Sequence, residues 1–181
     1  VEAKKERNEH RGSPFFGPPG KGTQWIIGAT NETDHTVLKL FQAVYLRRNL
    51  RRVYYSGYIP VNRYDNRLPV LNTPPLRREH RLYQADFLLR DYGFSVEDLP
   101  FAHSGSLPLD TDPKLAWARA NLIEQPVEIN QADLHELLRI PGIGPHGARV
   151  ILQARPQNRI RQIEDLKALG VSAQRAAPFI L

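Results

Sequence analysis

The sequence contains no cysteine and no methionine among its 181 residues. Without cysteine the chain cannot form a disulfide, a thiolate zinc site or an iron–sulfur cluster ligated by its own residues. Because it begins at Val1 and has no methionine, we expect a processed chain or, as we favour, a piece of a longer protein. It also lacks a run of about 18 apolar residues and an apolar signal segment, which argues against a membrane partner and favours a cytoplasmic protein.

Arginine is what the chain has in excess. Lysine and arginine number 25 against 19 acidic residues, 19 of the 25 are arginine, and the formal net charge is +6. A planar guanidinium binds phosphate through two parallel hydrogen bonds, so the excess favours a nucleic acid as partner, although solubility explains a basic surface equally well. The hydrophobic share of 41% is typical of a soluble globular protein.

The pattern of apolar residues divides the chain into four segments. Residues 1–22 are polar and then rich in glycine and proline, which predicts a flexible end and loop. Residues 23–94 predict a strand, a helix from Asp34, a second strand and another helix, so the first three form a parallel βαβ unit. Residues 95–129 predict a connector with one short helix, and residues 130–181 predict an all-α domain. The predicted fold class is therefore α/β followed by all-α.

The most specific pattern lies in residues 130–155, where two short amphipathic helices flank the turn PGIG. Glycines let a backbone approach a ligand closely, and this turn leads into the N-terminus of a helix, whose free N–H groups favour an anion. A phosphate of a nucleic-acid backbone fits such a turn, and no base edge is read. We expect Ile143 to fill the inside of the hairpin. The predicted DNA-binding residues are Gly142, Ile143, Gly144, His146, Gly147 and Arg149.

This turn resembles the helix-hairpin-helix DNA-binding motif, whose consensus is a hydrophobic residue, Pro, Gly, a hydrophobic residue, Gly and, four residues on, Ala. The matching residues are Ile140, Pro141, Gly142, Ile143, Gly144 and Ala148. Residues 163–171 resemble the helix and second turn that usually complete a pair of such motifs. They lack the proline and the second glycine, so we expect this half to serve packing. A helical hairpin with a glycine turn and no ligand is the alternative.

From about Thr23 onward the chain also resembles the C-terminal half of radical SAM proteins assigned to DNA modification or repair. The sequence segments that carry this resemblance are WIIGATNETD, REHRLYQADFLLR and DPKLAWA. The resemblance implies that the βαβ unit is the end of a partial (β/α) barrel, with its active site at the carboxyl ends of the strands. It places Gly28, Glu32, Ser56 and Tyr58 in an S-adenosylmethionine pocket.

The chain departs from that superfamily in lacking the CxxxCxxC loop that binds its [4Fe–4S] cluster. We therefore expect no cofactor and no radical chemistry within this chain, and both S-adenosylmethionine and the cluster only in a full-length parent. No metal site is expected, because the six histidines show no metal-ligand spacing. Catalytic residues are not identified.

The two resemblances leave three interpretations of function. In the first, the chain is the C-terminal part of a DNA modification or repair enzyme, and its tail binds the DNA backbone. In the second, it is a non-catalytic module that binds DNA or docks a partner such as a DNA-repair protein. In the third, the hairpin is structural. The arginines and tyrosines of residues 45–90 are a candidate second nucleic-acid surface, unless those arginines pair with acidic neighbours.

Overall fold

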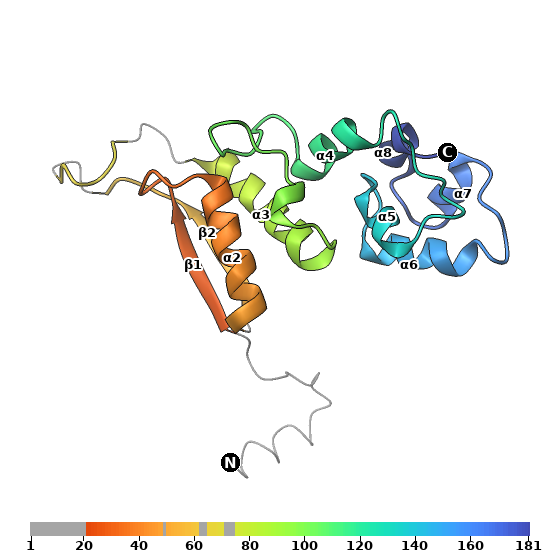
Figure 1. Cartoon of the computed structure of the whole chain (residues 1–181), viewed down its shortest axis with the longest axis horizontal. Helices are drawn as coiled ribbons and strands as arrows, with labels where there is room; N and C mark the ends of the chain where they lie inside the picture. The colour runs from red at the N-terminus through yellow and green to blue at the C-terminus, as the bar shows by residue number, and fades with distance from the viewer. Residues whose placement is uncertain (1–20, 49, 62–64, 71–74) are drawn as a thin grey trace, which may run out of the picture.

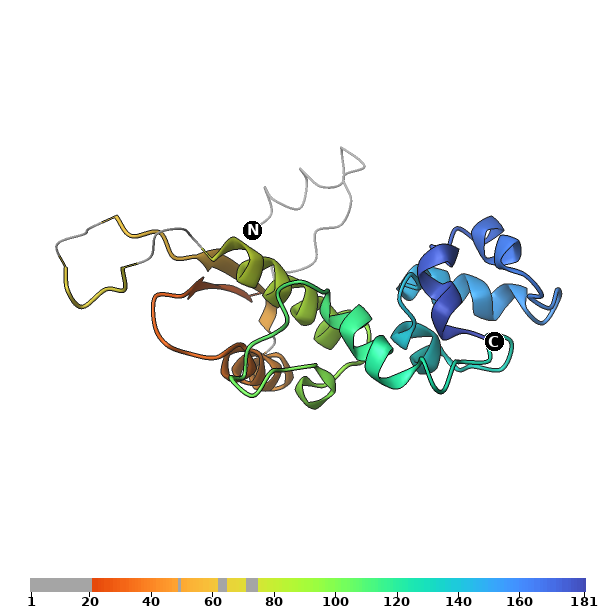
Figure 2. The same cartoon turned by 90° about the horizontal axis from the view of Figure 1, so that it is seen from above.

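The computed structural model describes residues 21–48, 50–61, 65–70 and 75–181 (Figure 1). The described chain is a mixed α/β protein: a small parallel sheet with its helices lies at one end, and a set of short helices lies at the other (Figures 1 and 2). The predicted α/β composition and the all-helical C-terminal region are confirmed. The described residues form two strands and no barrel.

The sheet consists of β1 (Lys21–Ile27) and β2 (Leu50–Gly57), which run parallel with Trp25 opposite Tyr55. Two parallel neighbours need a crossover, and α2 (Asp34–Arg48) provides it. The predicted βαβ unit is thus confirmed, and each of its elements begins or ends within a few residues of the predicted position.

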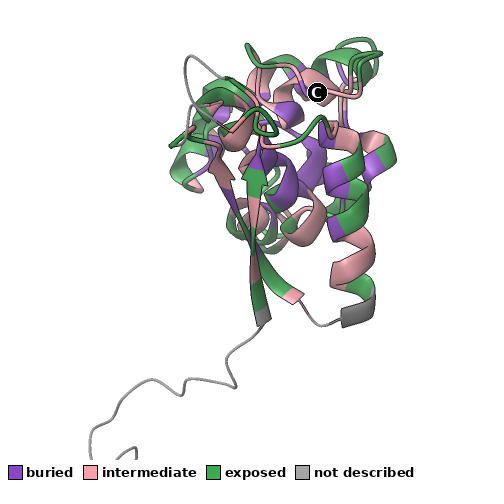
Figure 3. Cartoon of the chain, turned by 90° about the vertical axis from the view of Figure 1, so that its left-hand side faces the viewer, coloured by how far each residue is buried: buried purple, intermediate pink, exposed green. Residues whose placement is uncertain are grey.

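A first core lies between this sheet and the helices that pack against it. Its fully buried members include Ile27 and Val53 from the strands, Leu38 from α2 and Leu82 from α3 (Leu76–Asp91). In Figure 3 buried parts of the chain, in purple, lie where the strands and the helices face one another. The opposite face of the sheet keeps large side chains in solvent, so only one face is covered.

Helix α3 occupies the place that a further strand would take at the outer edge of β2. The Tyr83 hydroxyl accepts a hydrogen bond from the Tyr55 amide at 2.9 Å and donates to the Tyr55 carbonyl at 3.0 Å. The Gly57 amide donates to Glu79 Oε2 at 2.6 Å. Unpaired backbone groups at a strand edge otherwise attract another strand. The sheet therefore ends at β2, whereas in the described part of the chain the outer edge of β1 has no partner strand.

We expect the Tyr83→Phe variant to lose about 1–2 kcal/mol of unfolding free energy, because the hydroxyl makes two hydrogen bonds to an otherwise unpaired strand edge. Chemical denaturation measures the change. Tyr54→Phe is the matched control, since Tyr54 is 49% exposed on the same strand. Equal stabilities of the two variants would show that the edge contact contributes nothing.

Two buried carboxylates tie the helices of this first part together. Asp34 is fully buried and accepts from Arg78 Nε at 2.6 Å and from the Leu107 amide at 2.8 Å. Asp86 accepts from the Tyr45 hydroxyl at 2.5 Å and from Arg90 Nε at 2.9 Å. Burial, and then the contact with Asp86, raises the pKa of Tyr45, so its hydroxyl keeps the proton that it donates.

The candidate nucleic-acid surface at residues 45–90 is therefore used in part by the fold itself. Arg78 and Arg90 pair with buried acids, and Arg81 donates to the Leu109 carbonyl at 2.9 Å. Arg52 lies over the exposed Tyr54 ring at 5.4 Å and stays at the surface. Arg63 lies outside the described residues.

The short η1 (Val96–Asp98) follows α3 and places Val96 in the first core. The rest of the chain is helical and forms a second core. Its elements are α4 (Pro113–Asn121), α5 (Leu134–Arg139), α6 (Pro145–Ala154), α7 (Ile163–Ala168), α8 (Ala173–Ala176) and η2 (Ala177–Phe179). The end of the chain returns to the segment before α5, where the Val127 amide donates to the Phe179 carbonyl at 2.9 Å. Across the described residues, every helix is too short or too polar to cross a bilayer.

Candidate nucleic-acid interface

The predicted hairpin is present as α5, a turn over residues 140–144, and α6. Gly142 adopts a φ of 87°, a left-handed value that costs energy for any residue with a Cβ. A Cβ on Gly142 would also lie 2.5 Å from the Ser172 carbonyl oxygen. The space beside Gly142 is thus filled by the following part of the protein, and the need for glycine at this position comes from the turn and its packing.

Gly144 has a different role, because it begins α6. Its φ of −103° is open to any residue, and no side chain in the described part of the chain caps the helix. The amide groups of Gly144, His146 and Gly147 make no hydrogen bond within the described residues. These unpaired N–H groups and the dipole of the helix leave partial positive charge at this end.

The other predicted DNA-binding residues divide between the surface and the interior. His146 and Arg149 are exposed on α6. Ile143 is 1% exposed, which confirms that it fills the inside of the hairpin. A Cβ on Gly147 would lie 3.1 Å from the Val171 side chain, so Gly147 packs against the second half of the domain. A ligand could therefore reach the backbone at Gly144 and the side chains of His146 and Arg149, whereas Gly147 offers a ligand only its amide group.

Helix α7, the turn after it and α8 repeat this hairpin 28 residues later. The residues at matching positions are Leu138 and Leu166, Gly142 and Gly170, Ile143 and Val171, Ala148 and Ala176, and Ile151 and Phe179. Both glycines have a positive φ, and all the other members are buried. The Ser172 amide donates to the Gly142 carbonyl at 3.3 Å, so the two turns pack together. The expected packing role of this half is confirmed, and the spacing of 28 residues agrees with the second turn that the sequence predicts here.

Upstream residues that the motif does not include also reach the first turn. Lys114, near the start of α4, donates from Nζ to the Ile143 carbonyl at 2.6 Å. The same Nζ lies 4.6 Å from the centre of the Tyr92 ring. A cavity of about 370 Å³ separates this upstream part from the hairpin. The residues that line this hairpin cavity include Tyr92, Asp112, Lys114, Gly142, Gly144 and Arg175.

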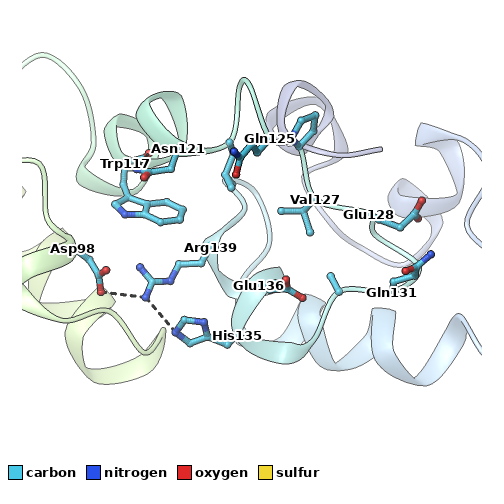
Figure 4. Close-up of a pocket in the computed structure, with 13 residues that line it drawn as sticks. Asp98, Trp117, Asn121, Gln125, Val127, Glu128, Gln131, His135, Glu136 and Arg139 are labelled. Carbon is cyan, nitrogen blue, oxygen red and sulfur yellow. Dashed lines mark hydrogen bonds and ion pairs between the residues drawn. The ribbon is translucent and has the colours of Figure 1, made fainter.

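Arg139, the last residue of α5, joins the hairpin to the upstream part. Its guanidinium lies between the rings of Phe94 and Trp117, at 4.0 and 4.8 Å from their centres. Nη2 donates to Asp98 Oδ2 and to His135 Nε2, each at 3.1 Å (Figure 4). Arg139 is only 8% exposed. Because these partners come from both parts of the chain, the hairpin is held in a fixed position relative to α4.

We expect Arg139→Leu to lower the free energy of unfolding by about 2–3 kcal/mol, because it removes a largely buried ion pair together with two ring contacts. Arg119→Leu is the matched control, since Arg119 is exposed on α4 and makes no ion pair among the described residues. Thermal or chemical unfolding compares the two variants. An Arg139 variant as stable as the control would contradict the bridging role.

The residues predicted for the S-adenosylmethionine pocket lie at the carboxyl ends of the strands. The Tyr58 amide donates to the Ile27 carbonyl at 2.8 Å, so Tyr58 lies beside Gly28. Ser56 accepts a hydrogen bond from β1 across the sheet. Glu32 Oε1 and the Tyr58 hydroxyl are buried and have no partner among the described residues. Nowhere in the described residues do three His, Asp or Glu side chains come close enough together to hold a metal ion.

Comparison with known proteins supports one part of these expectations. Residues 123–174 match the family model of the helix-hairpin-helix motif. No curated protein and no solved structure matches the chain. The match spans both turns, including Gly142 and Gly170, and covers the first hairpin and the second as far as the start of α8. The C-terminal region therefore carries a helix-hairpin-helix motif, which indicates nucleic-acid binding.

Proposed function

We propose that the helix-hairpin-helix region binds the backbone of DNA without strong preference for sequence. The observation that carries this proposal is the start of α6 in the matched motif, where unpaired amides of Gly144, His146 and Gly147 share one helix end with exposed basic side chains. Such a helix end favours a phosphate. Main-chain donors recognise phosphate oxygens and carry no information about the bases.

Affinities for unrelated DNA sequences test this proposal. We expect the whole chain to bind two labelled duplexes of equal length and unrelated sequence with affinities that agree within roughly threefold, because phosphate contacts carry no sequence information. A strong preference for one sequence would contradict backbone recognition. Failure to bind either duplex, with the fold intact, would favour the structural interpretation of the hairpin.

We propose further that the parent of this chain is a radical SAM enzyme that acts on DNA. The capped edge of β2 and the unpartnered edge of β1 within the described chain suit the last strands of a partial barrel. Glu32 Oε1 and the Tyr58 hydroxyl have no hydrogen-bond partner among the described residues and suit a polar ligand. Gly28, Glu32, Ser56 and Tyr58 would hold S-adenosylmethionine, whose bound chemistry is reductive cleavage at a cluster ligated elsewhere in the parent.

The intact mass and iron content of the native gene product, handled without oxygen, test the parent proposal. A larger protein with about four irons is expected, as for one [4Fe–4S] cluster. A product of 20.7 kDa without iron would contradict it. That result would leave the non-catalytic module, with DNA or a DNA-repair protein as its partner, as the proposed function.

A further inference from the structure

The hairpin cavity brings polar groups of two separate parts of the chain to the same place. The hairpin contributes Gly144 with its unpaired amide, and the upstream part contributes Tyr92 and Lys114. The cavity measures about 370 Å³ and lies at the turn for which the family match indicates nucleic-acid binding. Only the hairpin side of this cavity belongs to the matched residues.

Lys114 has hydrogen-bonding capacity that the fold does not use. Its ammonium carries three N–H groups, of which one donates to Ile143 and another faces the Tyr92 ring. The carboxylate that acts on this amine, Asp112, is already occupied, because Oδ1 accepts from the Leu115 amide at 2.9 Å and Oδ2 pairs with Arg175 at 3.0 Å. One N–H of Lys114 therefore remains for a ligand in the cavity.

Tyr92 adds a neutral donor at the same turn. Its hydroxyl makes no hydrogen bond within the described residues, and it lies 3.3 Å from the position that a Cβ on Gly144 would take. Glycine at position 144 thus leaves the space between the hydroxyl and the start of α6 open. The contacts of Arg139 hold the two sides of the cavity in a fixed position relative to each other.

We infer that the hairpin cavity seats one DNA phosphate, which is held by the Gly144 amide from the hairpin and by Tyr92 and Lys114 from the upstream part. This inference rests on the proposed DNA binding and makes it more specific. A phosphate between an amide, a hydroxyl and an ammonium receives charge-assisted hydrogen bonds from both sides. DNA recognition therefore extends beyond the matched motif, and the motif without α3 and α4 would bind more weakly.

The acid–base state of Lys114 gives this seat a pH dependence. Burial, opposed by the nearby Asp112 carboxylate and aided by the Arg175 guanidinium, lowers the pKa of Lys114 to about 7. A phosphate would favour the charged amine and raise its pKa again. Above pH 7, binding should then be accompanied by the uptake of as much as one proton. The affinity for DNA should therefore fall as the pH rises through the pKa that Lys114 has in the DNA-free protein. Tyr92 is the other titratable side chain against this amine, and its raised pKa keeps it neutral in that range.

Substitutions in the whole chain test whether the hairpin cavity binds a DNA phosphate. We expect Lys114→Met to bind a DNA duplex roughly fivefold more weakly and to reduce the slope of log affinity against log salt by about 0.9, the value for one phosphate contact. Tyr92→Phe should weaken binding roughly threefold and leave the slope unchanged, because it removes a neutral donor. Lys114→Arg should keep the slope. Lys39→Met, on the exposed surface of α2, is the control for loss of one positive charge.

The outcomes separate this inference from the proposed function. If the wild-type chain binds DNA and both the Lys114→Met and Tyr92→Phe variants bind like the Lys39→Met control, the seat is wrong and backbone binding by the hairpin stands. If the wild-type chain does not bind DNA, both proposals fail. Affinities at about pH 6.5 and 8.5 give a further readout: the difference between them should shrink in the Lys114→Met variant, which has no amine to protonate.

Discussion

The Gly144→Glu variant is expected to bind DNA of any sequence roughly 10- to 100-fold more weakly than the wild-type chain at moderate salt, because it places a carboxylate where a phosphate would bind. The fold should survive, since the φ of −103° at this position suits any residue. An acidic side chain at the start of α6 also interacts favourably with the helix dipole. Fluorescence anisotropy with labelled duplexes measures the loss.

The matched control for this substitution is Gln153→Glu, which adds the same charge on the exposed face of α6 near its other end. We expect the control to reduce affinity by no more than about twofold, through the general change in net charge. Unchanged binding by the Gly144→Glu variant, with an intact fold, would show that this turn does not contact DNA.

The Gly142→Ala variant is expected to lose about 3 kcal/mol or more of unfolding free energy. A left-handed residue with a Cβ costs about 1–2 kcal/mol. The new methyl group would in addition lie 2.5 Å from the Ser172 carbonyl oxygen, so the two packed turns would have to separate. Chemical denaturation of the whole chain measures this loss.

Gly144→Ala is the control, because the neighbouring glycine of the same turn has a negative φ and a Cβ there meets only the end of the Tyr92 side chain. We expect that variant to stay within about 1 kcal/mol of the wild type. If the two alanine variants were equally stable, the conformational explanation of Gly142 would be wrong.

Local patterns in the sequence predict most of the helices and strands. The apolar spacing after Asp34 and before Gly93 marks α2 and α3, and the apolar run around Trp25 marks β1. Asp112 accepts from the Leu115 amide at the start of α4, as a capping residue in a turn-rich connector should. These features depend on neighbours within about one or two turns of helix, which the sequence displays directly.

The contacts that join distant parts of the chain could not be predicted in this way. Lys114 meets Ile143 and Arg139 meets Asp98 across separations that no short pattern spans. In the sequence, Gly142 and Gly144 are both consensus glycines of the motif, and the consensus does not distinguish their roles. Their φ values distinguish them, since one glycine serves the turn and the other opens the helix end.

The salt dependence of DNA affinity tests the central claim most directly. Between about 50 and 200 mM salt, the account predicts a linear fall of log affinity against log salt, with a slope near −2 if Lys114 and Arg149 each contact one phosphate. The same slope is expected for duplexes of unrelated sequence. Affinity that does not change with salt, or the absence of any binding by the folded chain, would contradict recognition of the DNA backbone by the hairpin.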